Sequence, residues 1–131
     1  MDFNTIKSNI EFLDGLDRLN YLIDLSKNKN KLEKKYKIPE NKIPGCVSNA
    51  YLLIDSFDPC KIQTESDSEF VNGLLYILEL YVNNKSKKDI IEINGINLMD
   101  EIGLKNTITS QRVNGFYSAI QTLKEKILNE Q

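Results

Sequence analysis

Apolar residues in the first quarter of the chain recur at steps of three and four. This spacing gives a helix one apolar face. It predicts a helix over residues 2–14 and, after an interruption at Gly15, a second helix over residues 16–27. The next segment, residues 27–37, is rich in lysine. It is typical of a solvated, partly helical connector, and a docking patch is the alternative.

The pattern changes in the middle of the chain. The run from Val47 to Phe57 is rich in β-branched and aromatic residues without clean alternation, which predicts a strand buried on both faces at its centre. The pair Asp58-Pro59 is typical of a turn. Residues 60–66 then alternate between apolar or small and polar side chains, which predicts a half-exposed strand that completes a hairpin.

The second half of the chain is predicted to be helical. Its most apolar segment predicts a buried helix over about residues 67–82, started by a capping box in which Ser66 is followed by Glu69. Three more helices are expected: one through Ile91 capped by Ser86, one from Ile96 to Ile102 closed by Gly103, and one capped by Thr109 or Ser110. Helices around a small antiparallel sheet make an α+β fold. We expect one domain, residues 1–131.

Composition narrows the class of protein. The net charge of −2 gives no electrostatic indication of nucleic-acid binding. The N-terminus has no basic and apolar regions of a signal peptide, and no apolar run is long enough to span a bilayer. We therefore expect a cytoplasmic protein that acts away from membranes.

The chain has no histidine. A zinc or iron site would have to use two cysteines and carboxylates alone, which is a poor ligand set for those metals. A Cys-His dyad and a Ser-His-Asp triad are excluded, and the phosphate-binding glycine motifs are absent. A function based on a single thiol survives these exclusions.

The two cysteines have different surroundings. Cys60 shares strand parity with Ile62 and is expected to be a small buried apolar residue. Cys46, in the stretch NKIPGCVSNAY, follows a Pro-Gly pair and is either a thiol at a loop tip or a residue that merely begins a strand. The hairpin places the two at opposite ends, tens of ångströms apart at about 3.3 Å per residue, whereas a disulfide needs Cα atoms within about 7 Å. We predict no bridge between them, and we expect the Cys46 thiol to be largely shielded.

Four ordered blocks of the sequence resemble the SufE/CsdE family of sulfur-acceptor proteins. The central block, N-x-[IV]-x-G-C-x-S, is matched by Asn41, Ile43, Gly45, Cys46 and Ser48. The other three are similar to residues 17–25, to SDSEFVNGLL at residues 66–75, and to residues 102–116, which include Arg112 and Gly115. The blocks cover nearly the full chain, and the family's usual lysine before Gly73 is Asn72 here.

The resemblance implies a fold and an activity. The fold would be α+β of the SufE/IscU kind, with about three short strands in the sheet. The matching cysteine, Cys46, would accept sulfane sulfur from the persulfide of a SufS- or CsdA-like cysteine desulfurase, stimulate that enzyme, and pass the sulfur to the Suf scaffold for Fe–S clusters. The chain would hold no cofactor or metal of its own, because pyridoxal phosphate belongs to the desulfurase. It would be a partner and activator more than an independent enzyme.

The resemblance also suggests roles for other residues. Asn41, Gly45, Ser48 and Arg112 would support the loop of Cys46, and Arg112 either joins a hydrogen-bond network beneath that loop or contacts the desulfurase. Two further residues, Asp67 and Asn72, are candidates for partner binding. Two alternatives stay open: an adaptor that regulates a desulfurase without carrying sulfur, and a cluster scaffold of the IscU or NifU kind, against which the absence of histidine argues.

Overall fold

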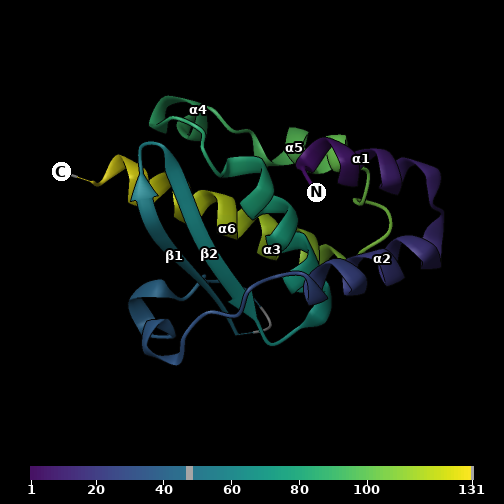
Figure 1. Cartoon of the computed structure of the whole chain (residues 1–131), viewed down its shortest axis with the longest axis horizontal. Coiled ribbons are helices and arrows are strands. Elements are labelled where there is room, and N and C mark those ends of the chain that lie inside the picture. Colours follow the sequence, from purple (N-terminus) through teal and green to yellow (C-terminus); the bar gives the residue numbers. More distant parts are fainter. Residues whose placement is uncertain (47–48, 131) are drawn as a thin grey trace.

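The structure is a computed structural model that describes residues 1–46 and 49–130. Helices surround one β-hairpin in it (Figure 1). Along the chain the elements are α1 Phe3–Phe12, α2 Gly15–Lys27, the 3-10 turns η1 Lys34–Tyr36 and η2 Pro39–Asn41, β1 Ala50–Phe57, β2 Cys60–Ser66, α3 Glu69–Val82, α4 Lys87–Ile91, α5 Gly95–Ile102 and α6 Ser110–Leu128. The predicted α+β class is confirmed, and each predicted helix is present.

Most helix ends follow local chemistry. Ser86 caps α4, Thr109 caps α6 by accepting from Arg112 N, and Gly103 ends α5 in the left-handed conformation with φ of 83°. The predicted capping box was wrong at α3. The cap there is Ser68, whose Oγ accepts from Val71 N at 3.4 Å, because Ser66 is still part of β2 and pairs with Ala50.

The hairpin is antiparallel and turns at Asp58-Pro59, as predicted. The prediction of about three strands was wrong, because the sheet in the described residues has two. An isolated bridge between Lys42 and Tyr51 lies beside β1. The prediction that β1 is buried on both faces was also wrong. Its buried residues, Ala50 and Leu52, lie on one face, and the rest of the strand is half-buried or exposed. The alternation predicted for β2 is confirmed.

The connector between α2 and β1 is less solvated than its lysines suggested. The Lys29 side chain is only 3% exposed, and its Nζ pairs with Glu79 of α3 at 2.8 Å. Glu79 also accepts a hydrogen bond from Thr64 N at 3.0 Å, so this buried pair joins the connector, α3 and β2. Lys37 pairs with Glu65 of β2. These two ion pairs connect the segment between α2 and β1 to α3 and to β2.

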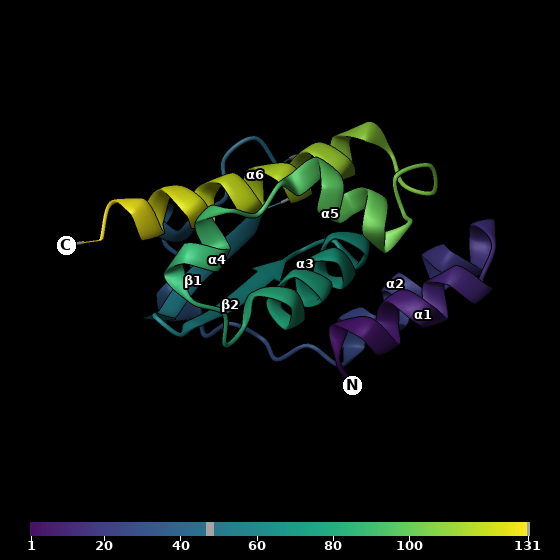
Figure 2. The same cartoon turned by 90° about the horizontal axis from the view of Figure 1, so that it is seen from above.

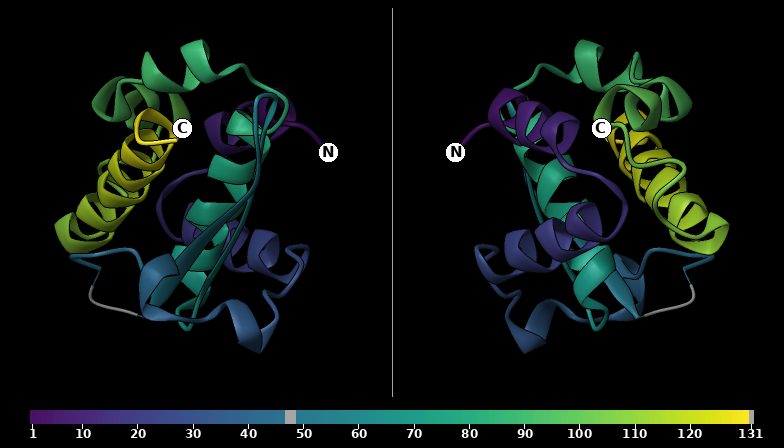
Figure 3. Two further views of the ribbon diagram at one scale, coloured as in Figure 1. Left: turned by 90° about the vertical axis from the view of Figure 1, so that its left-hand side faces the viewer. Right: turned by 90° about the vertical axis from the view of Figure 1, so that its right-hand side faces the viewer.

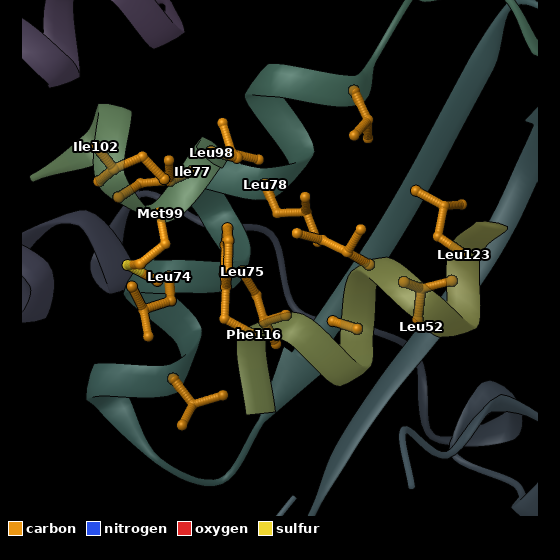
Figure 4. Close-up of a cluster of buried hydrophobic side chains, with 14 of the residues drawn as sticks. Leu52, Leu74, Leu75, Ile77, Leu78, Leu98, Met99, Ile102, Phe116 and Leu123 are labelled. Carbon is orange, nitrogen blue, oxygen red and sulfur yellow. The ribbon is translucent and has the colours of Figure 1, made fainter. Parts of the chain in front are cut away.

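Helix α3 is the centre of the molecule and contacts α2, β2, α6 and α1. Figure 2 shows α3 between the pair α1 and α2 on one side and α5 and α6 on the other. The core lies where these elements meet, and the side chains labelled in Figure 4 come from β1, α3, α5 and α6: Leu52, Leu74, Leu75, Ile77, Leu78, Leu98, Met99, Ile102, Phe116 and Leu123.

Gly73 marks a close approach between two helices. A Cβ at Gly73 would lie 2.3 Å from the carbonyl oxygen of Leu22, so the glycine lets α3 approach the backbone of α2. Within the described residues, no helix is long and apolar enough to cross a membrane.

Candidate functional site

Cys46 lies on the segment that leads into β1, next to the N-terminal half of α6. Figure 3 shows the blue segment after η2 reaching the first turns of α6. The Cys46 side chain is half-buried against the core, so the expected shielding is partial. Its Sγ lies 3.2 Å from where a Cβ at Gly115 would be. The glycine in α6 therefore leaves a recess that the sulfur occupies.

The backbone around Cys46 is shaped by Gly45 and by α6. Gly45 has φ of +73°, a left-handed conformation that L side chains rarely adopt. The hydroxyl of Ser118 donates to the carbonyl oxygen of Pro44. Residues 44 to 46 therefore contact one face of α6, through the Ser118 hydroxyl and through the recess at Gly115.

The two ends of this loop are fixed to the hairpin. Ile43 N donates to Ala50 O at 2.8 Å, and Asp67 N donates to Asn49 O at 3.1 Å. Lys126, near the end of α6, donates to Glu40 O at 3.1 Å. Partial burial of Lys126 lowers its pKa below the ordinary value. The base of the loop is thus held by backbone hydrogen bonds, while its tip contacts α6.

The other predicted site residues are placed as follows. Asn41 donates from Nδ2 to Tyr36 O at 2.8 Å, which ties the two 3-10 turns together. Arg112 is half-buried, and its guanidinium carbon lies 4.5 Å from the centre of the Phe70 ring, a cation–π contact that joins the first turns of α6 and α3. Ser48 lies outside the described residues.

The two residues considered for partner binding differ in what they do within the chain. Asn72 accepts from Ser66 N at 2.6 Å and donates to Ser66 O at 2.7 Å, so its amide fixes the end of β2. Asp67 is exposed and stands beside the loop of Cys46. It lines a pocket of about 210 Å³ with Lys37, Asn49, Tyr51, Glu65 and Ser66.

Glu65 and Lys37 form an ion pair in the lining of this pocket. Burial opposes the ionisation of its carboxyl group, but hydrogen bonds from Lys37 and from Leu32 N outweigh burial, so the pKa of Glu65 lies below its ordinary value. Glu65 is therefore ionised at neutral pH and paired with Lys37. The pair fixes the connector at Lys37 to β2.

Cys60 has a different environment, as the strand parity predicted. It is completely buried, its N donates to Lys85 O and its O accepts from Asn84 N, both at 2.7 Å. Burial raises the pKa of the Cys60 thiol to about 11. It is not a nucleophile at neutral pH, because the thiolate is the reactive form. No disulfide joins the two cysteines, as predicted, and no group of three or more metal-ligating side chains occurs in the described residues.

Sequence reasoning missed two contacts of the Cys46 loop. The sequence indicates Gly115 only as part of a motif and gives no indication of Ser118. Arg112, Gly115 and Ser118 follow one another at steps of three, which places them along one face of a helix. This spacing was the available signal, but it does not say what the face contacts.

Comparison with known proteins identifies the family of this chain. A sequence model of one protein family, described as "SufE: Fe-S metabolism associated domain", matches residues 4–127. The chain belongs to the SufE family. This membership places the chain in Fe–S metabolism, and the expected resemblance is confirmed.

The similar proteins cover most of the chain. A SufE-like protein of Rhizobium meliloti (strain 1021), described as uncharacterized, is 34% identical over 121 residues, which are 88% of this chain and 86% of that protein. A SufE-like protein of Synechocystis is 29% identical over 88% of this chain and 72% of its own length. A chloroplastic quinolinate synthase of Nicotiana tabacum is 22% identical, over 87% of this chain but 16% of the enzyme.

A solved structure shares the fold. The solution structure of a hypothetical protein from Thermus thermophilus has a TM-score of 0.74 and 14% identity, and the match covers 96% of this chain and 90% of that one. At this identity the likeness concerns the fold alone.

Proposed function

We propose that the chain is a sulfur acceptor and carrier that takes sulfane sulfur on Cys46 from a cysteine desulfurase. The observation that carries this proposal is the contrast between the two thiols. Cys46 is half-buried at the tip of a loop, whereas Cys60 is completely buried with a raised pKa. Only Cys46 can be reached by a partner without unfolding the hairpin.

The reaction is an exchange at sulfur. The Cys46 thiol first loses its proton to solvent, and the thiolate attacks the terminal sulfur of the persulfide on the desulfurase. A new S–S bond forms on Cys46, the S–S bond of the donor breaks, and the donor cysteine leaves as a thiolate. The sulfane sulfur changes carrier, with no net oxidation or reduction. This step needs no histidine, no metal and no cofactor on this chain; pyridoxal phosphate acts earlier, in the partner.

A sulfur carrier needs a second protein that receives the sulfur. We propose that the persulfide on Cys46 is passed to a Suf-type Fe–S scaffold complex in the cytoplasm, and that docking of this chain stimulates the desulfurase. The scaffold alternative has little chemical support, since the chain offers two cysteines, one of them buried, and no histidine as cluster ligands.

Intact-mass analysis tests the proposal. The protein is incubated without oxygen with a SufS-type cysteine desulfurase and cysteine, and then analysed whole and as peptides. We expect the wild type and Cys60→Ser to gain one sulfur atom, on the peptide of Cys46, and Cys46→Ser to gain none. Full stimulation of the desulfurase by Cys46→Ser, with no added sulfur on the wild type, would favour the adaptor and contradict sulfur carriage.

A further inference from the structure

One face of α6 holds the tip of the Cys46 loop. At successive steps of three along this face, Gly115 provides the recess for Sγ and Ser118 donates its hydroxyl to Pro44 O. Ser118 Oγ also lies 3.9 Å from where a Cβ at Gly45 would be. The loop therefore touches α6 on both sides of the bend that Gly45 makes.

The glycine in this face has a structural reason. Glycine within a helix is about 1 kcal/mol less favourable than alanine. Outside the helix itself, and among the described residues, a Cβ at Gly115 would have Cys46 Sγ as its one neighbour within 4 Å. The absent side chain thus serves the position of this sulfur and not the packing of two helices.

The contact with α6 also limits access to the sulfur. Sulfur exchange depends on access of the attacking thiolate to the donor sulfur, and one side of Cys46 Sγ is covered by the backbone of α6 at Gly115. The base of the loop is fixed by the bonds of Ile43 with Ala50 and of Asp67 with Asn49. A change at the tip can therefore occur without disturbing the hairpin.

We propose that Ser118 is a positioning residue for sulfur uptake: its hydrogen bond to Pro44 O holds residues 44–46 on α6, with Cys46 Sγ in the recess at Gly115. The effect of this position on sulfur uptake rests on the proposed function. The closed arrangement itself is a property of this chain and is measured without a partner.

The chain offers a matched control. Ser56 Oγ donates to Pro59 O at 2.6 Å, so a serine hydroxyl bonds a proline carbonyl there too, but at the turn of the hairpin. Ser118→Ala and Ser56→Ala each remove one such bond. Cys60 is a second, internal control, because it is completely buried and its labelling reports unfolding of the whole domain.

The experiment measures the rate at which iodoacetamide labels Cys46 and Cys60 in the full chain, by mass spectrometry of peptides. We expect Ser118→Ala to label at Cys46 about two- to tenfold faster than the wild type, as the loss of one hydrogen bond allows. Ser56→Ala should label at the wild-type rate, and Cys60 should stay slow in every variant. Equal rates at Cys46 in the wild type and Ser118→Ala, or equal acceleration in both serine variants, would overturn the proposal.

A second variant keeps the test decisive if Ser118→Ala does not fold. Gly115→Ala places a methyl group 3.2 Å from Sγ and should displace the sulfur, so labelling of Cys46 should accelerate while Cys60 stays protected. Unchanged labelling of a folded Gly115→Ala would count against the recess.

Persulfide loading is then measured with the desulfurase. Loading of Ser118→Ala should be faster at limiting desulfurase and should converge with the wild type at saturation. If Ser118→Ala labels faster than the wild type but the wild type gains no persulfide, the sulfur-carrier function is contradicted. The contact between the Cys46 loop and α6 is then still supported.

Discussion

The two cysteines of this chain show how environment decides the role of one residue type. Cys60 begins β2, and its own backbone is bonded on both sides to the segment after α3. Cys46 lies on a loop whose tip meets α6 through a side-chain hydroxyl and a recess. Backbone bonds of a completely buried residue such as Cys60 are lost only with the fold, whereas the contacts of a loop tip can be exchanged for contacts with a partner. The comparison therefore separates a completely buried thiol from a half-buried thiol on a loop.

The largest expected effect is the difference in thiol reactivity. At pH 8 a thiol with a pKa of about 11 is ionised in about one molecule per thousand, and Cys60 is also inaccessible. We expect iodoacetamide to label Cys60 at least about a hundredfold more slowly than Cys46 in the native protein, and the two rates to converge in urea. The measurement is the time course of both peptides. Similar rates for the two cysteines under native conditions would remove the distinction.

The second prediction compares two helical glycines, one in the core and one beside Cys46. A Cβ at Gly73 meets the carbonyl oxygen of Leu22 at 2.3 Å, a backbone atom that cannot move alone. Gly73→Ala should lower the free energy of unfolding by about 3 kcal/mol, since overpacking exceeds the gain in helix propensity. Gly115→Ala should leave it unchanged or raise it by up to about 1 kcal/mol, because the Cys46 loop can move away.

Urea denaturation followed by circular dichroism measures both glycine variants. Equal losses of stability in the two would mean that the Cys46 loop is as rigidly packed as the core. The distinction between a rigid core at Gly73 and a movable Cys46 loop would then be wrong.

The smallest effect is the alkaline dependence of stability caused by Cys60. Its pKa rises from 9.0 in the unfolded chain to about 11 in the folded protein, so the folded state holds the proton more tightly. This contribution is complete below about pH 9 and is lost as the pH rises through 11, by on the order of 2 kcal/mol. We expect Cys60→Ala to lack this part of the alkaline loss, with Cys46→Ala as the matched control. Parallel stability curves for Cys60→Ala and the wild type between about pH 8 and 11 would contradict it.

Several features could be predicted from sequence because they depend on near neighbours. The left-handed Gly103 at the end of α5 and the Thr109 cap of α6 use residues within one helical turn. The predicted capping box failed for an instructive reason. Ser66 has the right spacing to Glu69, but strand pairing with Ala50 and the amide of Asn72 hold it in β2.

Burial of the strands and of the connector could not be predicted in the same way. The apolar run of β1 has only one buried face, since the position of α3 and α6 decides which face is covered. The lysine-rich sequence around Lys29 predicted that its side chain would be exposed to solvent. Its charge is instead buried against Glu79, which comes from a helix far along the chain.

The α+β order of elements and the family could be predicted from the amino-acid sequence, because they depend on periodicity, turn chemistry and ordered motifs, and the same motifs make Cys46 the candidate thiol. The contacts of the Cys46 loop with α6 depend on how distant segments pack. Ser118 and Pro44 are 74 positions apart, and the sulfur of Cys46 meets α6 at a residue with no side chain. Such contacts follow from how helices pack around the hairpin. A pattern along the chain shows which face of α6 is available, but packing alone brings the thiol to that face.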